Sequence, residues 1–172
     1  FVHYKPQTLV VNNLEFDHAD IFADLNAIQT QFHHLVRCIP SSGHIIASKS
    51  DAIDEVLNRG CWTPVSRLDT GSPDDWSVQA RDKHFGEFEI SSPAGDRGAI
   101  TWRLIGRHNA ENALAAVAAA HDIGVSVKDA CEALCRFEGV KRRLELLGAP
   151  NEIAIYDDFA HHPTAVKTTL EG

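Results

Sequence analysis

Three short clusters of polar side chains have the residue types and spacing that chemistry needs. The first runs from residue 12 to residue 18, Asn-Asn-Leu-Glu-Phe-Asp-His, between a predicted strand and a predicted helix. Its carboxylate oxygens and imidazole nitrogen suit Mg²⁺ or another cation that accompanies phosphate. The same residues are also typical of a polar loop in which Asp17 or Asp20 caps the following helix. The local pattern leaves both interpretations open.

The second cluster, residues 106–112, opens an alanine-rich segment and is built around two asparagines. Asn109 and Asn112 stand three residues apart at the start of a predicted helix, so their side chains share one face. Two carboxamides side by side match the edge of adenine, which carries one hydrogen-bond donor and one acceptor. The alternative is an asparagine that caps an ordinary alanine-rich helix.

The third cluster combines a basic pair with an acidic and histidine-rich stretch further along the chain. Arg142 and Arg143 could each bind phosphate oxygens through two hydrogen bonds, and the carboxylates of 157–158 could bind ribose hydroxyls. His161 and His162 precede a predicted helix N-terminus, which favours an anion. The alternative is a surface group of salt bridges with a histidine at the helix cap.

The elements that must position these clusters predict an α/β fold with a mostly parallel sheet flanked by helices. The first sixty residues give a strand at 8–11, an amphipathic helix over 21–36, a strand at 44–47, and a helix from Ser50 to Gly60. This β-α-β-α order is typical of a parallel sheet. Ligands bind such sheets beyond the carboxyl ends of the strands, where the first and third clusters lie.

The remaining segments predict a small antiparallel hairpin or meander and further helices. Apolar and polar residues alternate in three stretches, and Trp62, Trp76 and Trp102 are expected to pack in this part of the chain. The stretches are 76–80, 85–90 and 100–104, with a turn at 93–98. Helices are predicted at 109–121, from Ser126 to Phe137 and from Pro163, and a strand at 153–156.

Composition limits the class of protein. The chain has 172 residues, 44% hydrophobic and 23% charged, which is ordinary for a globular protein of about one domain. A net charge of −8 argues against non-specific binding to nucleic acid or to anionic membranes. No apolar run is long enough to span a bilayer. The four cysteines form no CxxC pair, and we expect reduced thiols of a cytoplasmic protein.

The three clusters, taken in this order, resemble the Mur ligases, the ATP-dependent enzymes that form amide bonds in bacterial cell-wall precursors. The similarity covers essentially the whole chain and is strongest at 12–22, 31–37, 142–146 and 156–164. The chain begins at Phe1 and contains no methionine, so we expect an interior fragment. The resemblance implies that residues 1–142 are the later part of a central ATP-binding domain. Residues 143–172 would then begin a Rossmann-like C-terminal domain.

The resemblance also implies a reaction. ATP would phosphorylate the carboxylate of UDP-N-acetylmuramate, and an amine would attack the resulting acyl phosphate. Residues 13–18 and 32–36 are most similar to the branch that adds the tripeptide L-Ala-γ-D-Glu-meso-diaminopimelate during peptidoglycan recycling. Two alternatives stay open. One is the branch that adds L-alanine to the same sugar, and the other is a non-catalytic module that binds a nucleotide or a metal.

Five residues match the family's ATP-binding positions. Asn109 and Asn112 match the pair that contacts adenine, with His108 beside them. Arg143 matches an arginine that approaches the nucleotide phosphates, and Asp158 matches an aspartate that binds the ribose.

The remaining matches concern the metal and the active-site cleft. His18 matches a histidine that binds Mg²⁺, and His161 and His162 match a motif near the cleft. The chain contains no GxxxxGK[ST] phosphate loop, and the family's acidic magnesium ligand and UDP-sugar domain are not found in it. We therefore assign no catalytic residue within the fragment and expect the fragment alone to be inactive.

Overall fold

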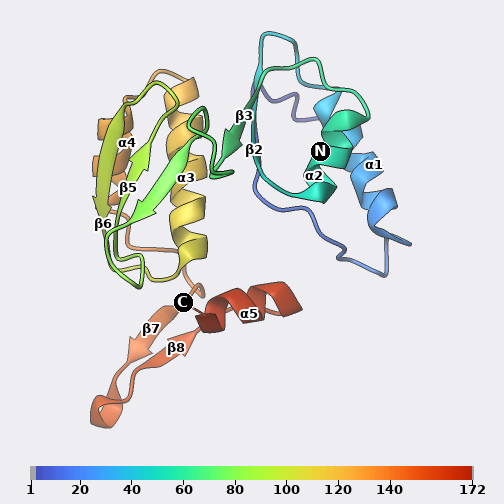
Figure 1. Ribbon diagram of the computed structural model, residues 1–172. Coiled ribbons are helices and arrows are strands. Elements are labelled where there is room, and N and C mark those ends of the chain that lie inside the picture. Colours follow the sequence, from blue (N-terminus) through green and yellow to red (C-terminus); the bar gives the residue numbers. More distant parts are fainter. Residues whose placement is uncertain (1–2, 172) are drawn as a thin grey trace.

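A parallel sheet, an antiparallel sheet and a hairpin succeed one another along the chain (Figure 1). The structure is a computed structural model that describes residues 3–171. The first part contains β1 (Thr8–Val11), α1 (Leu25–Val36), β2 (His44–Ser48), α2 (Asp51–Asn58) and β3 (Val65–Leu68). The second contains β4 (Ser77–Ala80), β5 (Glu87–Ser91), β6 (Arg97–Thr101), α3 (Arg107–Asp122) and α4 (Val127–Leu134). The third contains β7 (Glu145–Gly148), the 3₁₀ turn η1 (Pro150–Glu152), β8 (Ile155–Asp157) and α5 (Pro163–Glu171).

The parallel sheet has the order β1-β2-β3, as expected for a β-α-β-α start. Its middle strand is covered on both faces, which explains the continuous apolar run. Ile45 and Ala47 pack with α1 and α2, whereas Ile46 joins the core around α3. All three side chains are at most 1% exposed. Alternation of side chains along β2 thus divides the interior into two cores.

The antiparallel sheet, with the order β4-β5-β6, confirms the predicted meander. Helices α3 and α4 lie beside this sheet (Figure 1). Its buried side chains, Phe88, Ile90 and Ile100, share one core with residues of these two helices. The small side chains of α3 let this helix pack closely, and Ala110, Ala113 and Ala115 are among the buried residues. The alanine-rich helix therefore links the two sheets and carries the second polar cluster at its N-terminal end.

Several predicted boundaries are wrong, each for a local reason. The first helix begins only at Leu25, because Asp24 rather than Asp17 or Asp20 caps it by accepting a hydrogen bond from Ala27 N at 2.8 Å. The last strand of the meander is 97–101 rather than 100–104. The preceding turn closes already at Ser92, whose backbone N donates to Asp96 O at 2.9 Å.

Two strands and the exposure of one tryptophan differ from the sequence predictions. β3 and β7 were not predicted, since neither has a full alternation of apolar and polar residues.

The packing expected of the tryptophans is confirmed for Trp76, which is 4% exposed, but wrong for Trp62, which is 58% exposed. The caps predicted at Ser50 and Ser126 are confirmed, since each hydroxyl accepts a backbone N–H in the first turn of its helix.

A network of hydrogen bonds connects the C-terminal end of α3 to the amino ends of the three parallel strands. Asp122 accepts from Thr8 Oγ1 and contacts His44 Nδ1 at 2.6 Å, and His44 Nε2 lies 2.9 Å from Ser66 Oγ. Burial tends to raise the pKa of Asp122. The hydrogen bonds from Thr8 and His44 outweigh that effect and hold this pKa below its ordinary value.

Replacing Asp122 by asparagine should therefore make stability depend less on pH. A carboxylate with a lowered pKa stabilises the fold above the unfolded pKa of about 3.9, and this contribution is lost as the pH falls through the folded pKa. We expect Asp122→Asn to lower the free energy of unfolding by about 1–2 kcal/mol at pH 7, with the difference shrinking towards pH 3. Urea unfolding between pH 7 and pH 3 measures this. The control is Asp74→Asn in an exposed loop, and an equal difference at every pH would contradict the prediction.

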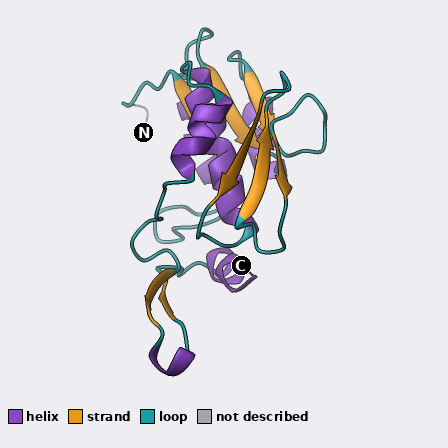
Figure 2. Ribbon diagram, turned by 90° about the vertical axis from the view of Figure 1, so that its left-hand side faces the viewer, coloured by secondary structure: helices purple, strands orange, loops and turns teal. Residues whose placement is uncertain are grey.

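The C-terminal residues form a separate small unit. β7 and β8 pair antiparallel and extend away from the two larger sheets, and α5 turns back towards the N-terminal end of α3 (Figures 1 and 2). Apolar side chains such as Leu146, Leu147 and Ile153 are more than half exposed here. Within residues 3–171, no helix combines the length and the apolar character needed to cross a membrane.

Candidate nucleotide site

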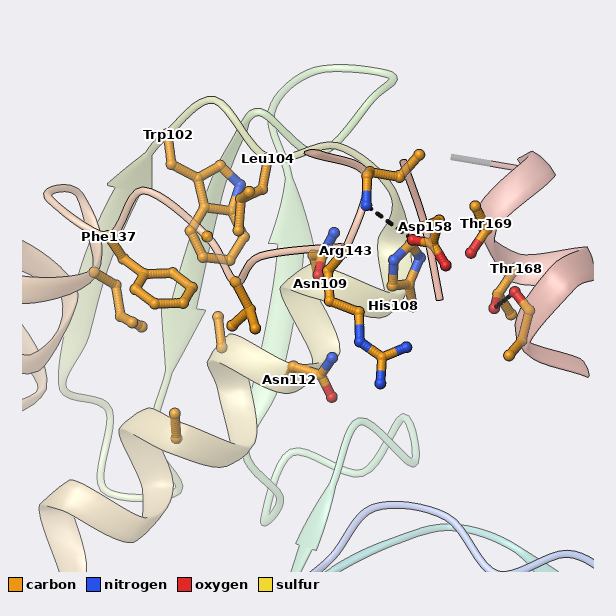
Figure 3. A pocket seen from close by; sticks show the side chains of 17 residues that line it. Trp102, Leu104, His108, Asn109, Asn112, Phe137, Arg143, Asp158, Thr168 and Thr169 are labelled. Atoms are coloured by element: carbon orange, nitrogen blue, oxygen red, sulfur yellow. Dashed lines mark hydrogen bonds between the residues drawn. The ribbon is translucent and has the colours of Figure 1, made fainter. Parts of the chain in front are cut away.

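A cavity of about 690 Å³ lies where the N-terminal half of α3 meets the segment after β6, the link after α4 and helix α5 (Figure 3). It contains all five residues predicted to bind ATP. Its polar lining residues are His108, Asn109, Asn112, Arg143, Asp158, Thr168 and Thr169. Its other lining residues are Trp102, Leu104, Ala113, Ala116, Leu134, Phe137, Gly139, Val140, Leu144 and Ala165. The second and third polar clusters of the sequence therefore meet at one cavity.

The two asparagines of α3 have different surroundings. Asn109 Nδ2 donates to Ile105 O at 2.7 Å, so this carboxamide holds the loop that enters the helix. Asn112 lies about one turn further on, and its Oδ1 accepts a hydrogen bond from Asn12 Nδ2 at 3.1 Å. The predicted alternative of an asparagine cap is wrong, because Gly106, with φ 92°, is the N-cap residue. Among the described residues, the hydrogen bond to Asn12 uses only Oδ1 of Asn112, so its Nδ2–H groups are available to a ligand.

His108 lies one residue into α3 and lines the same cavity. Burial lowers the pKa of His108, against weaker opposite effects of Glu111 and Asp158. The imidazole is therefore neutral at pH 7 and suited to packing or neutral hydrogen bonding. The neighbouring Arg107 is not in the cavity, because its guanidinium is engaged by Asp69 at 2.8 Å and Glu111 at 2.7 Å.

The link between α4 and β7 separates the two arginines of the third cluster. Arg143 lines the cavity, and Arg142 and Leu144 on either side of it have φ values of 60° and 49°. Such left-handed residues reverse the chain locally. Arg142 consequently points elsewhere, with its guanidinium carbon 5.0 Å from the ring centroid of Phe159 and its Nε 3.4 Å from Asp157 Oδ2. Only Arg143 of this pair is available to a ligand in the cavity.

Asp158 is held by the backbone on both sides of the hairpin. Its Oδ2 accepts from Leu144 N at 2.8 Å, shown as the dashed line in Figure 3, and its Oδ1 accepts from Ala160 N at 2.7 Å. Each carboxylate oxygen retains a lone pair for another donor. The hairpin therefore fixes a carboxylate at the rim of the cavity, opposite the N-terminal end of α3.

The apolar wall of the cavity was missed by the sequence analysis. Trp102 packs against Phe88 with ring centroids 5.2 Å apart and donates Nε1–H to Phe85 O at 3.0 Å, and it also lines the cavity with Phe137. Trp102 lies only six residues before His108, which is the one signal that could have placed it there. Flat aromatic walls with a few polar groups are typical of sites for a purine nucleotide.

The first cluster lies beside a second cavity of about 340 Å³, next to α1. Its polar lining residues are Asn13, Glu15, Asp17, His18 and Gln31, and its other lining residues are apolar. His18 adopts a left-handed φ of 55°, and Asp17 Oδ1 accepts its backbone N–H at 2.7 Å. That hydrogen bond holds the pKa of Asp17 below its ordinary value. The donor types suit a divalent cation. Across residues 3–171, however, no three histidine, cysteine, aspartate or glutamate side chains converge to hold one, so any such site is incomplete here.

The first and third clusters are in contact. Glu15 Oε2 accepts from Thr164 Oγ1 at 2.7 Å, and Glu15 Oε1 lies 3.5 Å from His162 Nδ1. His162 Nε2 is also 3.3 Å from Phe16 O. His161 lies edge-on to Phe159, with ring centroids 5.1 Å apart. Of the two histidines, His162 contacts the loop that carries His18 through Glu15 and Phe16.

The cavity beside the N-terminal half of α3 has the mixed apolar and polar lining of a small-molecule site, and comparison with known proteins gives the family. Residues 2–120 match the model of the Mur ligase middle domain. The chain therefore belongs to the Mur ligase family. This match covers the two larger sheets and most of α3.

Two relatives belong to one branch of this family. The chain is 47% identical to UDP-N-acetylmuramate–L-alanyl-γ-D-glutamyl-meso-2,6-diaminoheptandioate ligase of Haemophilus influenzae over 171 residues, 99% of the chain and 37% of the relative. The same enzyme of Escherichia coli is also 47% identical with the same coverage. The chain thus spans little more than a third of the length of these relatives.

Two solved structures resemble this chain, one from the same branch and one from another ligase. A murein peptide ligase of Psychrobacter arcticus has a TM-score of 0.78 and 48% identity, covering 99% of this chain and 35% of that one. A MurF ligase of Acinetobacter baumannii has a TM-score of 0.83 at 24% identity, covering 97% of this chain and 37% of that one. The second match concerns the fold alone, and it confirms the predicted α/β class.

Proposed function

We propose that the large cavity binds ATP, with adenine against Asn112 and His108, ribose at Asp158 and phosphates near Arg143. The observation that carries this proposal is that five residues from three separate segments line one cavity. Asn109 contributes by holding the loop that leads into α3. In this arrangement Trp102 and Phe137 form the apolar wall for the purine.

We further propose that residues 1–142 are the later part of a central ATP-binding domain and that residues 143–172 begin a C-terminal domain. Support comes from the family match, which ends at residue 120, and from the hairpin and α5, which form a unit of their own. The complete ligase would be a chain of the relatives' length that contains these 172 residues. In it, Arg143 and Asp158 would close the nucleotide site from the C-terminal side.

The proposed reaction joins UDP-N-acetylmuramate to L-Ala-γ-D-Glu-meso-diaminopimelate. The sugar carboxylate attacks the γ-phosphorus of ATP and ADP leaves. The tripeptide amine then attacks the acyl phosphate, an amide bond forms, and phosphate leaves. Such a reaction depends mainly on positioning and on neutralising phosphate charge, and Arg143 supplies part of that charge. We propose that this activity belongs to peptidoglycan recycling and takes place in the cytoplasm, where ATP and UDP-linked precursors are available.

We propose that Mg²⁺ accompanies ATP and that His18 is one of its ligands. The left-handed backbone at His18 and the hydrogen bond from its N–H to Asp17 keep this residue in a defined position. A bound Mg²⁺ would neutralise phosphate charge. The other ligands would come from parts of the ligase beyond these residues. His162, just before α5, contacts this loop at Phe16 O.

The test is product formation by the full-length ligase. ADP release would be followed with ATP, Mg²⁺ and UDP-N-acetylmuramate, adding either the tripeptide or L-alanine. We expect the tripeptide to drive release, because identity to the tripeptide ligases is 47% and to an L-alanine ligase of Arthrobacter only 34%. Release driven by L-alanine would assign the protein to the other branch. No release with either amine would favour a non-catalytic binding module.

The 172-residue chain alone should release no ADP under the same conditions. It contains no phosphate loop of the GxxxxGK[ST] type, which supplies much of the phosphate binding in ATPases. The same assay with the purified chain checks this, and turnover above a protein-free control would contradict it.

A further inference from the structure

The carboxamide that faces the proposed adenine position is itself held by a second asparagine. Asn12 directly follows β1, and its Nδ2 donates to Asn112 Oδ1 at 3.1 Å across a sequence separation of 100 residues. The contact joins the loop of the first cluster to the helix that lines the cavity. Within residues 3–171, no acceptor is found for the Nδ2 hydrogens of Asn112, which leaves that amide nitrogen for a ligand.

We propose that Asn12 is a positioning residue that fixes which way the Asn112 carboxamide faces and thereby sets the preference for adenine. This inference rests on the proposed function, because it requires a purine base in the cavity. Asn12 itself does not line the cavity and acts only through Asn112.

The chemistry depends on which atom of the amide meets position 6 of the purine. Adenine has an amino group there, beside a ring nitrogen that accepts a hydrogen bond. Hypoxanthine has a carbonyl oxygen at the same position. With Oδ1 held by Asn12, the amide offers an acceptor to the amino group and its Nδ2–H to the ring nitrogen. A reversed amide would place Nδ2–H against position 6, which suits a carbonyl oxygen and opposes an amino group.

Aspartate at position 12 tests this directly because it has nearly the same shape as asparagine. Its carboxylate can only accept, so it would hold Nδ2 of Asn112 and reverse the amide. In the full-length ligase, kcat/KM would be measured with ATP and with ITP by phosphate release. We expect Asn12→Asp to lower the ratio of kcat/KM for ATP to kcat/KM for ITP by about tenfold or more. A good bidentate contact to a base gives about that discrimination.

Two further variants keep the test decisive. Asn12→Ala removes the hydrogen bond to Asn112 without imposing an orientation on its carboxamide. The ratio of kcat/KM for ATP to kcat/KM for ITP should therefore fall by less than with Asn12→Asp. Asn12→Ala also tests the proposal if the aspartate variant does not fold. Asn26→Asp is the charge-matched control, because Asn26 Oδ1 in α1 already accepts from Arg59 at 2.8 Å and an aspartate satisfies the same contact. Its ratio should equal that of the wild type.

The outcomes separate the two proposals. A wild-type ligase that turns over ATP, with an unchanged ATP to ITP ratio in both Asn12 variants, would overturn the positioning role and leave the nucleotide site standing. An equal loss with both nucleotides would show a structural role only and also overturn it. A wild-type ligase without any turnover would remove the proposed function, and the role of Asn12 with it.

Discussion

Arg143→Ala in the full-length ligase is expected to lower kcat for ADP release by about 10³-fold. An arginine that neutralises charge on a transferring phosphoryl group typically contributes at least this much. Arg143 lines the cavity from the link after α4, where Arg142 and Leu144 adopt left-handed backbone conformations that set its direction. The measurement is ADP release at saturating ATP, UDP-N-acetylmuramate and tripeptide.

The adjacent arginine provides a matched control. Arg142 has the same side chain one residue earlier, but it stacks on Phe159 and pairs with Asp157 outside the cavity. Arg142→Ala should therefore reduce kcat less than about tenfold, as expected for an exposed ion pair. Arg143→Lys should recover only part of the loss, because lysine lacks the planar pair of donors. Equal effects of the two alanine variants would contradict the assignment of Arg143.

Gly98→Ala is expected to destabilise the chain by about 2–3 kcal/mol, through overpacking between β6 and α4. A Cβ at residue 98 would lie 2.5 Å from Cys131 Sγ, 2.9 Å from Cys131 Cβ and 3.1 Å from Val127 O. Cys131 is 1% exposed, so neither side can move away freely. Burial also raises the pKa of Cys131 to about 11, which keeps the thiol protonated and apolar in its contact with the glycine.

A double-mutant cycle measured by urea unfolding tests this contact. Gly98→Ala should cost about 1 kcal/mol less when Cys131 is alanine, since the nearest atom is then absent. Gly148→Ala is the control, because no atom lies within 4 Å of a Cβ there, and it should change stability by less than about 0.5 kcal/mol. If Gly98→Ala were as neutral as Gly148→Ala, the close packing of α4 on β6 would be wrong.

Elements with a strong periodic pattern were predictable from the sequence. The apolar run at 44–47 became the middle strand of the parallel sheet, and the caps at Ser50 and Ser126 began helices as expected. The alanine-rich helix was also predicted, although it starts at Arg107 with Gly106 as its cap. In each case the secondary structure favoured by the local sequence is also the one that tertiary packing requires. The sequence pattern alone was therefore enough to predict the element.

Features set by tertiary contacts were not predictable. β3 contains Arg67 and Ser66 rather than an apolar run, because its polar side chains pair with Asp54 and His44. The delayed start of α1 depends on the hydrogen bonds that organise residues 17–22 around His18. The aromatic wall depends on how Trp102 and Phe137, far apart in sequence, come together over α3.

The candidate site was partly predictable for a physical reason. The residues of the second and third clusters could be chosen from their types, and the resemblance gave their roles, but the sequence did not show that they share a cavity. The structure brings these residues together. It also gives Arg142 and Arg143 different contacts, and likewise His161 and His162, which no spacing rule distinguishes.

The most direct test of the nucleotide site is a crystal structure of the full-length ligase with a non-hydrolysable ATP analogue. We predict adenine hydrogen-bonded to Asn112, the ribose within hydrogen-bonding distance of Asp158 and the phosphates facing Arg143. A nucleotide bound elsewhere, with the cavity between α3, the hairpin and α5 empty, would contradict the account.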